Sequence, residues 1–315
     1  MRGIHILATG RALPRKIMDN YEMSTFVDTS DEWIRSRTGI GQRHVCEEES
    51  CVSLAVSAAK TALDKAVSEY GITKDDIGIL VVATTTPDYA FPSAACMVHK
   101  QLGLSNEVIS FDISAACSGF LYGLDVCRGL LITGEKKYAL LIGSEQLSRI
   151  VDYTDRSSCV IFGDGAGAAV LELSDKLYVQ KSWSSGDEDT LFCKGVGQEE
   201  SYLHMDGNKV FRFAVQALSE SMAHVMEQAG VTMDDVDYVI CHQANARIIE
   251  HIRRKYPEHK DKFYMNIEHY GNTSAASIPI AMDEMFELGK LKEGMKVVCI
   301  SFGAGFTWSG ALFEL

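Results

Sequence analysis

Residues 71–82 read GITKDDIGILVV, and residues 230–241 read GVTMDDVDYVIC. The two stretches agree at most of their twelve positions by identity or conservative exchange, in one register. Each follows a long segment, SLAVSAAKTALDKAVSEY at 53–70 and VFRFAVQALSESMAHVMEQA at 210–229, whose apolar residues recur at helical spacing. A repeated helix-then-strand unit indicates that the chain contains two copies of one supersecondary structure.

Strand-like runs extend this repeat in matching order. GILVVAT, EVISFDI and KYALLIG occur in the first half, and DYVIC, KFYMNI and KVVCISF occur in the second. Their alternation with helical segments predicts an α/β fold with one sheet in each half. We expect the first half to span residues 1–173 and the second 174–315, with the more polar segment 174–205 acting as an insertion or a covering region.

Composition narrows the class of protein. The chain has 315 residues, with 46% hydrophobic and 23% charged residues, as is usual for a globular protein. No apolar run reaches the ~18 residues of a membrane span. The nine cysteines form no C-x-x-C pair, so we expect reduced thiols in the cytoplasm. The net charge of −13 argues against a nucleic-acid partner.

Cys117 is the first candidate for chemistry. It lies in DISAACSGF (112–120), between a strand-like run and a helix-like run. A thiol at a helix N-terminus faces unpaired N–H groups and the positive end of the helix dipole, so we expect its pKa to fall below about 8.5. The small neighbours would leave backbone N–H groups accessible to a substrate oxygen. A buried and unreactive cysteine is the alternative.

His242 and Asn272 are the matching candidates in the second half. His242 directly follows the strand-like run DYVIC, and Asn272 lies in GNTSAAS. Cys117 and Asn272 follow the two repeat copies at similar distances, which predicts that they are equivalent positions of the duplicated unit. Because ligands of open α/β sheets gather beyond the carboxyl ends of the strands, the three side chains could meet. Taken singly, each could instead cap a helix or a turn.

Seven motifs together carry a resemblance to a known family. They are TSDEWIRSRTGI, AFPSAAC, DISAACSGF, FGDGAGAAV, HQANARI, GNTSAAS and FGAGFTW. In this combination the sequence resembles β-ketoacyl-acyl-carrier-protein synthase III, the condensing enzyme that starts bacterial fatty acid synthesis, from end to end. The resemblance implies a thiolase-like fold of two duplicated halves about a pseudo-twofold, layered αβαβα. It also implies a homodimer.

The resemblance assigns roles to individual residues. It implies a Cys117–His242–Asn272 triad and an oxyanion hole made by the backbone N–H groups of Cys117 and Ala304. The residues that it implies for binding coenzyme A are Trp33, Arg37, Arg156, Gly207 and Asn245. It also implies that Phe91 is the loop residue that reaches into the acyl pocket of the partner chain. Two positions depart from the family pattern, because Ser157 and Ala304 stand where glycine is common.

The implied reaction joins a short acyl-CoA primer to malonyl-acyl-carrier protein through an acyl-cysteine. No metal or cofactor is implied, since coenzyme A is part of the substrate, and no membrane partner is expected. An acidic carrier protein needs basic residues on a chain of net charge −13, and these are expected at Arg247, Arg212, Arg253, Arg254, Lys255, Lys260 and Lys262. The alternatives are a condensing enzyme of secondary metabolism that uses other acyl-CoA or malonyl-CoA substrates, a non-catalytic acyl-binding protein and a thioester hydrolase.

Overall fold

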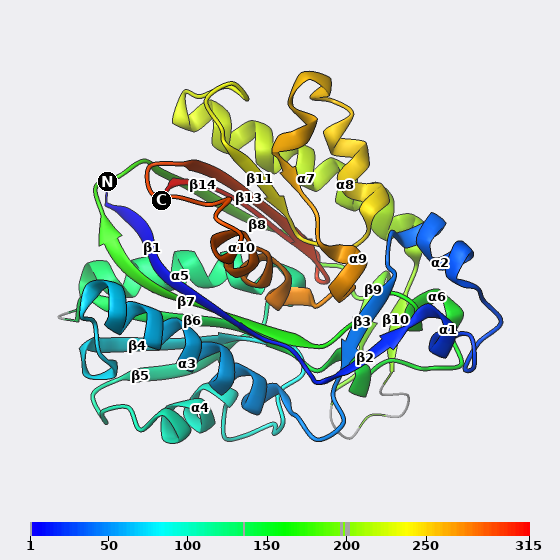
Figure 1. The fold of residues 1–315 in the computed structure, drawn as a ribbon, viewed down its shortest axis with the longest axis horizontal. Helices are drawn as coiled ribbons and strands as arrows, with labels where there is room; N and C mark the ends of the chain where they lie inside the picture. The colour runs from blue at the N-terminus through cyan, green and yellow to red at the C-terminus, as the bar shows by residue number, and fades with distance from the viewer. Residues whose placement is uncertain (1, 135, 196–197, 199–201) are drawn as a thin grey trace.

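The structure is a computed structural model that describes residues 2–134, 136–195, 198 and 202–315. Two five-stranded sheets organise it (Figure 1). The first has the order β1–β7–β6–β4–β5, with β1 at Gly3–Ala12, β7 at Gly165–Ser174, β6 at Tyr138–Glu145, β4 at Ile77–Ala83 and β5 at Ile109–Ile113. The second has the order β8–β14–β13–β11–β12, with β8 at Tyr178–Ser184, β14 at Thr307–Glu314, β13 at Lys296–Gly303, β11 at Tyr238–Cys241 and β12 at Phe263–Tyr264.

The two sheets have the same topology. In each, three neighbouring strands run parallel, and two antiparallel strands complete the sheet: β4 pairs in parallel with β5 and β6, and β11 pairs in parallel with β12 and β13. β7 and β14 run antiparallel to both of their neighbours. The repeat in the sequence is therefore a repeat of the fold.

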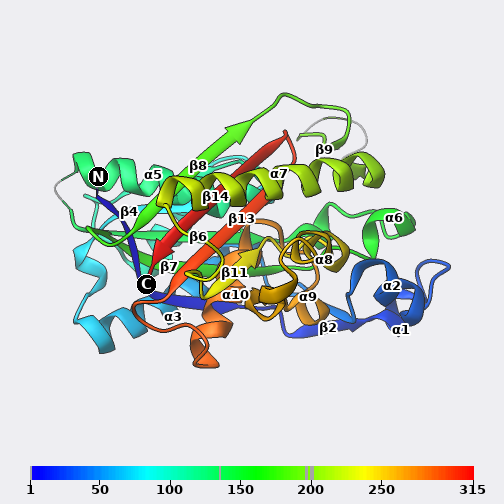
Figure 2. The same ribbon diagram turned by 90° about the horizontal axis from the view of Figure 1, so that it is seen from above.

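Helices form three layers around the sheets, and Figures 1 and 2 show their order. α3 (Cys51–Tyr70) and α4 (Ala94–Leu102) cover the outer face of the first sheet. α5 (Gly119–Thr133) and α10 (Ser277–Glu287) pack between the sheets. α7 (Gly207–Ala229) and α8 (Ala246–Arg253) cover the outer face of the second sheet. This αβαβα order confirms the predicted fold class.

The smaller elements gather at the end of the molecule opposite the two termini (Figures 1 and 2). They are β2 (Lys16–Asp19), α1 (Asn20–Met23), α2 (Asp31–Thr38), β3 (Gln42–Val45), α6 (Arg156–Cys159), β9 (Leu191–Cys193), β10 (Leu203–Met205) and α9 (Ile267–Tyr270). Short 3-10 turns lie at η1 (Lys74–Asp76), η2 (Ala116–Ser118), η3 (Leu147–Arg149), η4 (Pro257–Lys262) and η5 (Ser274–Ala276).

The division at residue 173 stays a prediction, and it falls within one residue of the end of β7, the last strand of the first sheet along the chain. Segment 174–205 was expected to be an insertion or covering region, but it also supplies β8, an edge strand of the second sheet. Sequence analysis did not identify this strand, because β8 is only partly buried and its sequence is correspondingly polar. None of the helices in the described residues is long and apolar enough to cross a membrane.

A buried ion cluster ties the halves together. The Asp283 carboxylate on α10 is fully buried and accepts from Arg11 of β1 at 2.7 Å and from Lys65 of α3 at 2.6 Å. Thr9 donates a further hydrogen bond at 2.9 Å. A buried carboxylate needs such partners, so these contacts fix α10 of the second half against the first sheet.

Candidate active site

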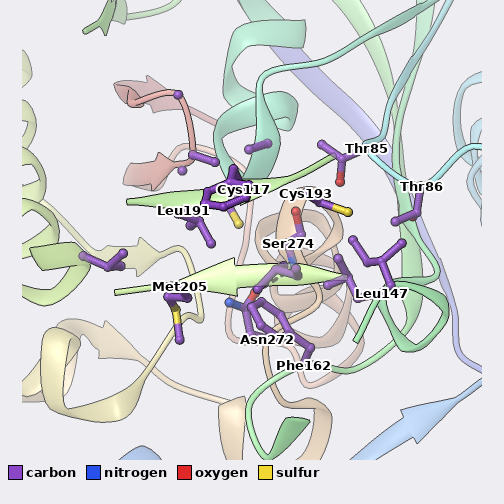
Figure 3. Close-up of a pocket in the computed structure, with 18 of the residues that line it drawn as sticks. Thr85, Thr86, Cys117, Leu147, Phe162, Leu191, Cys193, Met205, Asn272 and Ser274 are labelled. Carbon is purple, nitrogen blue, oxygen red and sulfur yellow. Dashed lines mark hydrogen bonds between the residues drawn. The ribbon is translucent and has the colours of Figure 1, made fainter. Parts of the chain in front are cut away.

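One cavity of about 1040 Å³ lies where the two halves meet. Its lining includes Cys117 from the first half and His242, Asn272 and Ala304 from the second. Figure 3 shows Cys117 and Asn272 in this lining. Gly207 and Asn245 also line it. The structure thus brings the three proposed catalytic side chains into one space, from positions as distant as residues 117 and 272.

Cys117 is placed by a short turn beyond the carboxyl end of β5. Ala116, the first residue of η2, has a positive φ of 46°, and α5 begins two residues after Cys117. Non-glycine residues adopt this conformation only when their surroundings enforce it. The turn holds the thiol beside the cavity.

The predicted low pKa of Cys117 is wrong for this structure. Burial raises the pKa of the thiol to about 12, a hydrogen bond with Ser274 lowers it, and the nearby Glu145 carboxylate raises it further. Removal from water destabilises a thiolate. The thiol is therefore protonated at neutral pH, and a reaction at sulfur needs a proton acceptor.

His242 follows β11, and its ring is almost fully buried. Its Nδ1 lies 2.6 Å from Oγ of Ser277, whereas its buried Nε2 has no protein partner among the described residues. Burial lowers the pKa of His242 to about 3, so the ring is neutral at physiological pH. When the Ser277 hydroxyl donates to Nδ1, the proton of the ring resides on Nε2 and can be donated to a substrate oxygen.

Asn272 is fixed through its backbone and its side chain. Its N–H donates to the carbonyl of Ile161 at 2.9 Å, and its carbonyl accepts from Gly163 at 3.0 Å. Oδ1 accepts the N–H of Ser274 at 2.8 Å, which leaves Nδ2 to donate toward the cavity. The side chain is thus an oriented hydrogen-bond donor near Cys117 (Figure 3).

The predicted equivalence of Cys117 and Asn272 in the duplicated unit is wrong. The positive-φ residue that opens the corresponding turn is Ala116 in η2 and Ser274 in η5, with φ of 46° and 50°. Cys117 therefore corresponds to Ala275. Ala275 lies 34 residues after Cys241, and Cys117 lies 35 residues after Val82, so the count along the sequence also favours Ala275 over Asn272, which lies 31 residues after Cys241.

Both residues of the proposed oxyanion hole, Cys117 and Ala304, line the cavity. Gly303 ends β13 so close to η2 that a Cβ built on it would lie 2.7 Å from the backbone N of Cys117. Ala304 follows and also lines the cavity. Among the described non-glycine residues only Ala116 and Ser274 have positive φ, so alanine at 304 is unstrained where the family often has glycine.

The three residues proposed to hold the adenine end of coenzyme A also lie together. Arg156 places Cζ 4.8 Å from the centre of the Trp33 ring, and Arg37 places it at 5.7 Å. Ser30 caps α2 by accepting the N–H of Trp33, which fixes this ring at the start of the helix. The hydroxyl of Ser157, the other departure, donates to Asp155 and stabilises the start of α6.

The basic residues differ in their relation to the cavity. Arg247 is exposed on α8, and its Cζ lies 5.9 Å from the centre of the Phe211 ring, which lines the cavity. Arg212, Arg254 and Lys255 are exposed on or near the same outer layer. Arg253 is half-buried and donates to Glu250 at 2.7 Å. Lys260 and Lys262 lie on η4, where Lys262 donates to the carbonyl of Met233.

Phe91 lies in the segment between β4 and α4, and its side chain points to solvent with 85% exposure. It does not belong to the described lining of the cavity in its own chain. The apolar edge strand β5 lies nearby in the same sheet, with Ile109 54% exposed. An exposed phenylalanine beside an unpaired strand edge is typical of a surface that meets another chain.

Sequence reasoning missed three polar residues of the site: Ser274, Ser277 and Glu145. The two serines lie within GNTSAAS, but a single sequence gave no reason to prefer them over Asn272. Glu145 is the last residue of the apolar strand β6, and His242, which the sequence analysis identified, directly follows the apolar strand β11. A charged residue at the carboxyl end of a buried strand was the signal available.

The comparisons with known proteins agree along the whole chain. Residues 226–315 match the family described as 3-oxoacyl-[acyl-carrier-protein] synthase III C terminal, and residues 111–185 match 3-oxoacyl-[acyl-carrier-protein] synthase III. A β-ketoacyl-[acyl-carrier-protein] synthase III of Clostridium botulinum is 44% identical, over 98% of each chain. One of Clostridium beijerinckii is 42% identical over 100% of each.

Solved structures give the same result. The crystal structure of 3-oxoacyl-[acyl-carrier-protein] synthase III from Aquifex aeolicus has a TM-score of 0.93 and 41% identity, covering 99% of this chain and 100% of that one. The corresponding enzyme from Pseudomonas aeruginosa has a TM-score of 0.92 and 35% identity, covering 99% and 98%. Sequence and fold therefore point to one family.

Proposed function

Because this chain belongs to the 3-oxoacyl-[acyl-carrier-protein] synthase III family, we propose that its cavity performs the condensation that initiates fatty acid synthesis. The enzyme is a transferase of the thiolase-like condensing type. It joins an acyl-CoA primer to malonyl-acyl-carrier protein. The observation that carries this proposal is the meeting of Cys117, His242 and Asn272 in one cavity.

In the first half-reaction the sulfur of Cys117 attacks the thioester carbonyl of the primer. The backbone N–H groups of Cys117 and Ala304 would stabilise the oxyanion, since preorganised donors stabilise charge as it develops. Coenzyme A leaves as a thiol, and the acyl group remains on sulfur. Trp33, Arg37 and Arg156 would hold the adenine end, and Gly207 and Asn245 the pantetheine chain.

In the second half-reaction malonyl-acyl-carrier protein enters the same cavity and loses CO2. Nε2–H of neutral His242 and Nδ2–H of Asn272 would donate to the thioester oxygen as it becomes an enolate. The enolate carbon then attacks the acyl-cysteine, which releases a 3-oxoacyl product and leaves Cys117 as a thiolate, and uptake of one proton from solvent restores the thiol. The chemistry itself calls for no metal or redox cofactor, because coenzyme A and CO2 leave without any change of oxidation state.

We further propose a cytoplasmic homodimer. The exposed Phe91 and the open edge of β5 support contact with a second copy of the chain. Nine cysteines with no C-x-x-C pair are typical of a reducing compartment. The exposed Arg247, which lies over the ring of the cavity residue Phe211, supports docking of an acidic carrier protein.

A condensing enzyme of secondary metabolism is not favoured, because curated relatives at 42–44% identity over the whole chain carry the synthase III name. A non-catalytic acyl-binding protein would have no need of an intact triad. A thioester hydrolase would release free acid from the acyl-cysteine without a malonyl substrate, so the two activities are separable by their products.

The deciding experiment is the intact mass of the protein after acetyl-CoA is added and again after malonyl-acyl-carrier protein is added. We expect a gain of one acetyl group on Cys117, followed by its loss with formation of a 3-oxoacyl-carrier protein. Cys117→Ala is the control and should gain no acetyl group. If neither acetyl-CoA nor longer or branched primers acylate Cys117, the proposed function is wrong.

A further inference from the structure

Arg43 is a buried cation that the proposed reaction leaves without a role. It lies in β3, is 0% exposed and is among the largest fully buried side chains of the described chain. Its guanidinium donates to neutral oxygens: Nη1 to Oδ1 of Asn20 at 2.9 Å and to the carbonyl of Met18 at 3.3 Å, and Nη2 to the carbonyl of Val160 at 2.7 Å. Burial lowers the pKa of Arg43 to about 10, which leaves it charged at neutral pH. Burying a charge among neutral partners costs free energy, so such a residue calls for an explanation.

Asn20 connects Arg43 to α2, the helix that carries Trp33. Asn20 is also 0% exposed, and its Nδ2 donates to Oδ1 of Asp31 at 2.9 Å and to the carbonyl of Ile40 at 2.8 Å. Asp31 is the first residue of α2, and Ile40 directly follows the C-cap of that helix. Because a guanidinium can only donate, Arg43 holds the amide oxygen of Asn20 toward itself and the amide nitrogen toward both ends of α2.

The other nitrogen of Arg43 contacts α6, the short helix that carries Arg156. Val160 is the C-cap of α6, and the carbonyl groups at the end of a helix have no partner within the helix. Nη2 of Arg43 supplies a partner for the Val160 carbonyl from the interior of the protein. Figures 1 and 2 show α2 and α6 together at the end of the molecule opposite the termini. One buried guanidinium therefore links the two helices that form the proposed adenine site.

The exposed contacts between these helices are weaker supports. Arg156 places Cζ 4.8 Å from the centre of the Trp33 ring, and its Nη1 donates to the Asp28 carbonyl at 2.7 Å. Arg156 and Asp28 are exposed, so water competes for both groups. The hydrogen bonds of Arg43 are shielded from water, and a low local dielectric strengthens them. The buried side chain is therefore better placed than the surface contacts to fix the position of Trp33 relative to Arg156.

We propose that Arg43 is a positioning residue for the coenzyme A end of the substrate. By holding α2 and α6 at a fixed separation, it sets the spacing of Trp33, Arg37 and Arg156 before coenzyme A arrives. A site whose side chains are already in place loses less conformational entropy when the ligand binds, so it binds more tightly. This inference rests on the proposed function, in which these three residues hold the adenine end. It predicts that Arg43 affects only substrates that carry this end.

The test compares acetyl-CoA with S-acetylpantetheine, which carries the same thioester but lacks the nucleotide of coenzyme A. Arg43→Met removes the donors and keeps Cβ, against which Gly163 and Gly271 pack: Cβ atoms built on these glycines would lie 3.0 and 3.3 Å from it. We expect kcat/KM for acetylation of Cys117 by acetyl-CoA to fall about tenfold, through KM, and the value for S-acetylpantetheine to stay within about twofold of wild type. Equal losses with the two donors, or an unchanged value with acetyl-CoA, would overturn the inference.

Arg11→Met is the matched control, because it makes the same substitution in another network with a buried partner. Asp283 keeps Lys65 and Thr9 as partners in this variant. Whatever the change does to both rates, the ratio of the two kcat/KM values should remain that of the wild type. A shift in this ratio as large as that of Arg43→Met would show a general effect of core damage and would contradict the inference.

Two further variants separate position from charge. Arg43→Lys keeps the charge, but its single nitrogen cannot replace two guanidinium nitrogens that bond toward different helices, so the loss with acetyl-CoA should persist. Once all three adenine-end residues are replaced by alanine, Arg43→Met should cause no further loss with acetyl-CoA, because residues of one network are not additive. Full activity of Arg43→Lys, or a further loss in the alanine background, would count against the role of Arg43.

Asp31→Ala tests the same network from its partly exposed end should Arg43→Met fail to fold. Asp31 accepts from Asn20 and also from Arg35, whose Nε lies at 2.8 Å. Glu268→Ala is its control, since Glu268 accepts from Arg35 at 2.7 Å, whereas the Asn20 amide bonds Asp31. Asp31→Ala should lower the ratio of the acetyl-CoA value to the S-acetylpantetheine value, and Glu268→Ala should not. An unchanged ratio in Asp31→Ala, or an equal change in both variants, would overturn the inference.

Calorimetry with coenzyme A gives a readout that needs no turnover. The wild-type protein should bind coenzyme A about tenfold more tightly than Arg43→Met. If it does so but no primer acylates Cys117, the proposed function fails and the role of Arg43 stands. If Cys117 is acetylated but Arg43→Met binds coenzyme A as tightly as the wild type, the role of Arg43 alone fails. A wild-type protein that does not bind coenzyme A overturns both.

Discussion

At the scale of single residues, the site combines one protonated nucleophile with two oriented donors. Burial keeps Cys117 a thiol and His242 a neutral imidazole. The Ser277 hydroxyl fixes the orientation of the His242 ring at Nδ1, and the N–H of Ser274 fixes that of the Asn272 amide at Oδ1. These two hydrogen bonds matter because a donor stabilises a developing charge best when its direction is fixed before the reaction. The division of labour between Cys117 and the two donors predicts separable half-reactions.

Asn272→Ala should slow malonyl decarboxylation about 100-fold while acetylation of Cys117 changes by less than tenfold. The amide donates to the enolate, whereas the first oxyanion is stabilised by backbone N–H groups. Each half-reaction is measured alone, by CO2 release and by intact mass. Equal loss in both half-reactions would refute the assigned role of Asn272.

Gly303→Ala should impair acetylation at least 100-fold, because the new Cβ would lie 2.7 Å from the N of Cys117, in the space of the oxyanion. Gly129→Ala is the control, since it lies on α5, the helix that begins just after Cys117, with nothing within 4 Å of the added Cβ. Single-turnover acetylation rates test this. A Gly303→Ala enzyme with a wild-type rate would place the oxyanion elsewhere.

At the scale of elements, turns beyond strand ends position the chemistry. η2 follows β5, His242 follows β11, η5 follows β12 and α9, and Glu145 ends β6. Parallel strands bring these ends to one edge of each sheet, where a ligand can be reached from several loops. Helix α8 begins at the same edge, with Asn245 as its N-cap and the exposed Arg247 over the ring of Phe211, which lines the cavity.

Arg247→Glu should reduce kcat/KM for malonyl-acyl-carrier protein about tenfold at low salt and leave acetylation by acetyl-CoA unchanged. The effect should shrink as salt screens the attraction between the arginine and the acidic partner. Lys60→Glu makes the same change of charge at an exposed position of α3, in the opposite outer layer, and should have little effect on kcat/KM for malonyl-acyl-carrier protein. Unchanged kinetics for Arg247→Glu across salt concentrations would remove this residue from the docking surface.

At the scale of the whole molecule, duplication creates the site. Each half alone presents strand ends, but only their packing places the thiol of one half against the donors of the other. The buried Asp283 cluster and the α5–α10 layer fix this packing. The two halves pack closely at Gly143 of β6, where an added Cβ would lie 2.3 Å from the carbonyl oxygen of Ala275 in the other half.

Phe91→Ala should leave a dimer in solution and improve the use of longer primers relative to acetyl-CoA about tenfold, because the side chain would close the acyl pocket of the partner chain. Light scattering gives the oligomeric state, and competition between primers gives the preference. Val67→Ala, a change at an exposed apolar residue of α3, serves as the control. A monomeric wild-type protein would contradict the proposed homodimer.

The amino-acid sequence by itself determined the duplicated α/β fold and the candidate residues. The repeat at 71–82 and 230–241, the helical periodicity and the order of strand-like runs are local patterns, and local patterns set which elements form. The motifs DISAACSGF, HQANARI and GNTSAAS named Cys117, His242 and Asn272 before any contact was known. β8 and the short strands β2, β3, β9 and β10 were not identified, because short or edge strands with few buried residues have no clear alternation.

Only the tertiary structure decided how these residues behave. The pKa of Cys117 depends on burial by segments far away in the chain, so the helix-start pattern predicted the wrong direction. The equivalence of Cys117 with Ala275 rather than Asn272 emerged from two matching positive-φ turns. The buried Glu145 carboxylate accepts from Ser274, which lies 129 residues away in the sequence. Desolvation and hydrogen bonding depend on neighbours in space, and spacing along a chain does not encode them.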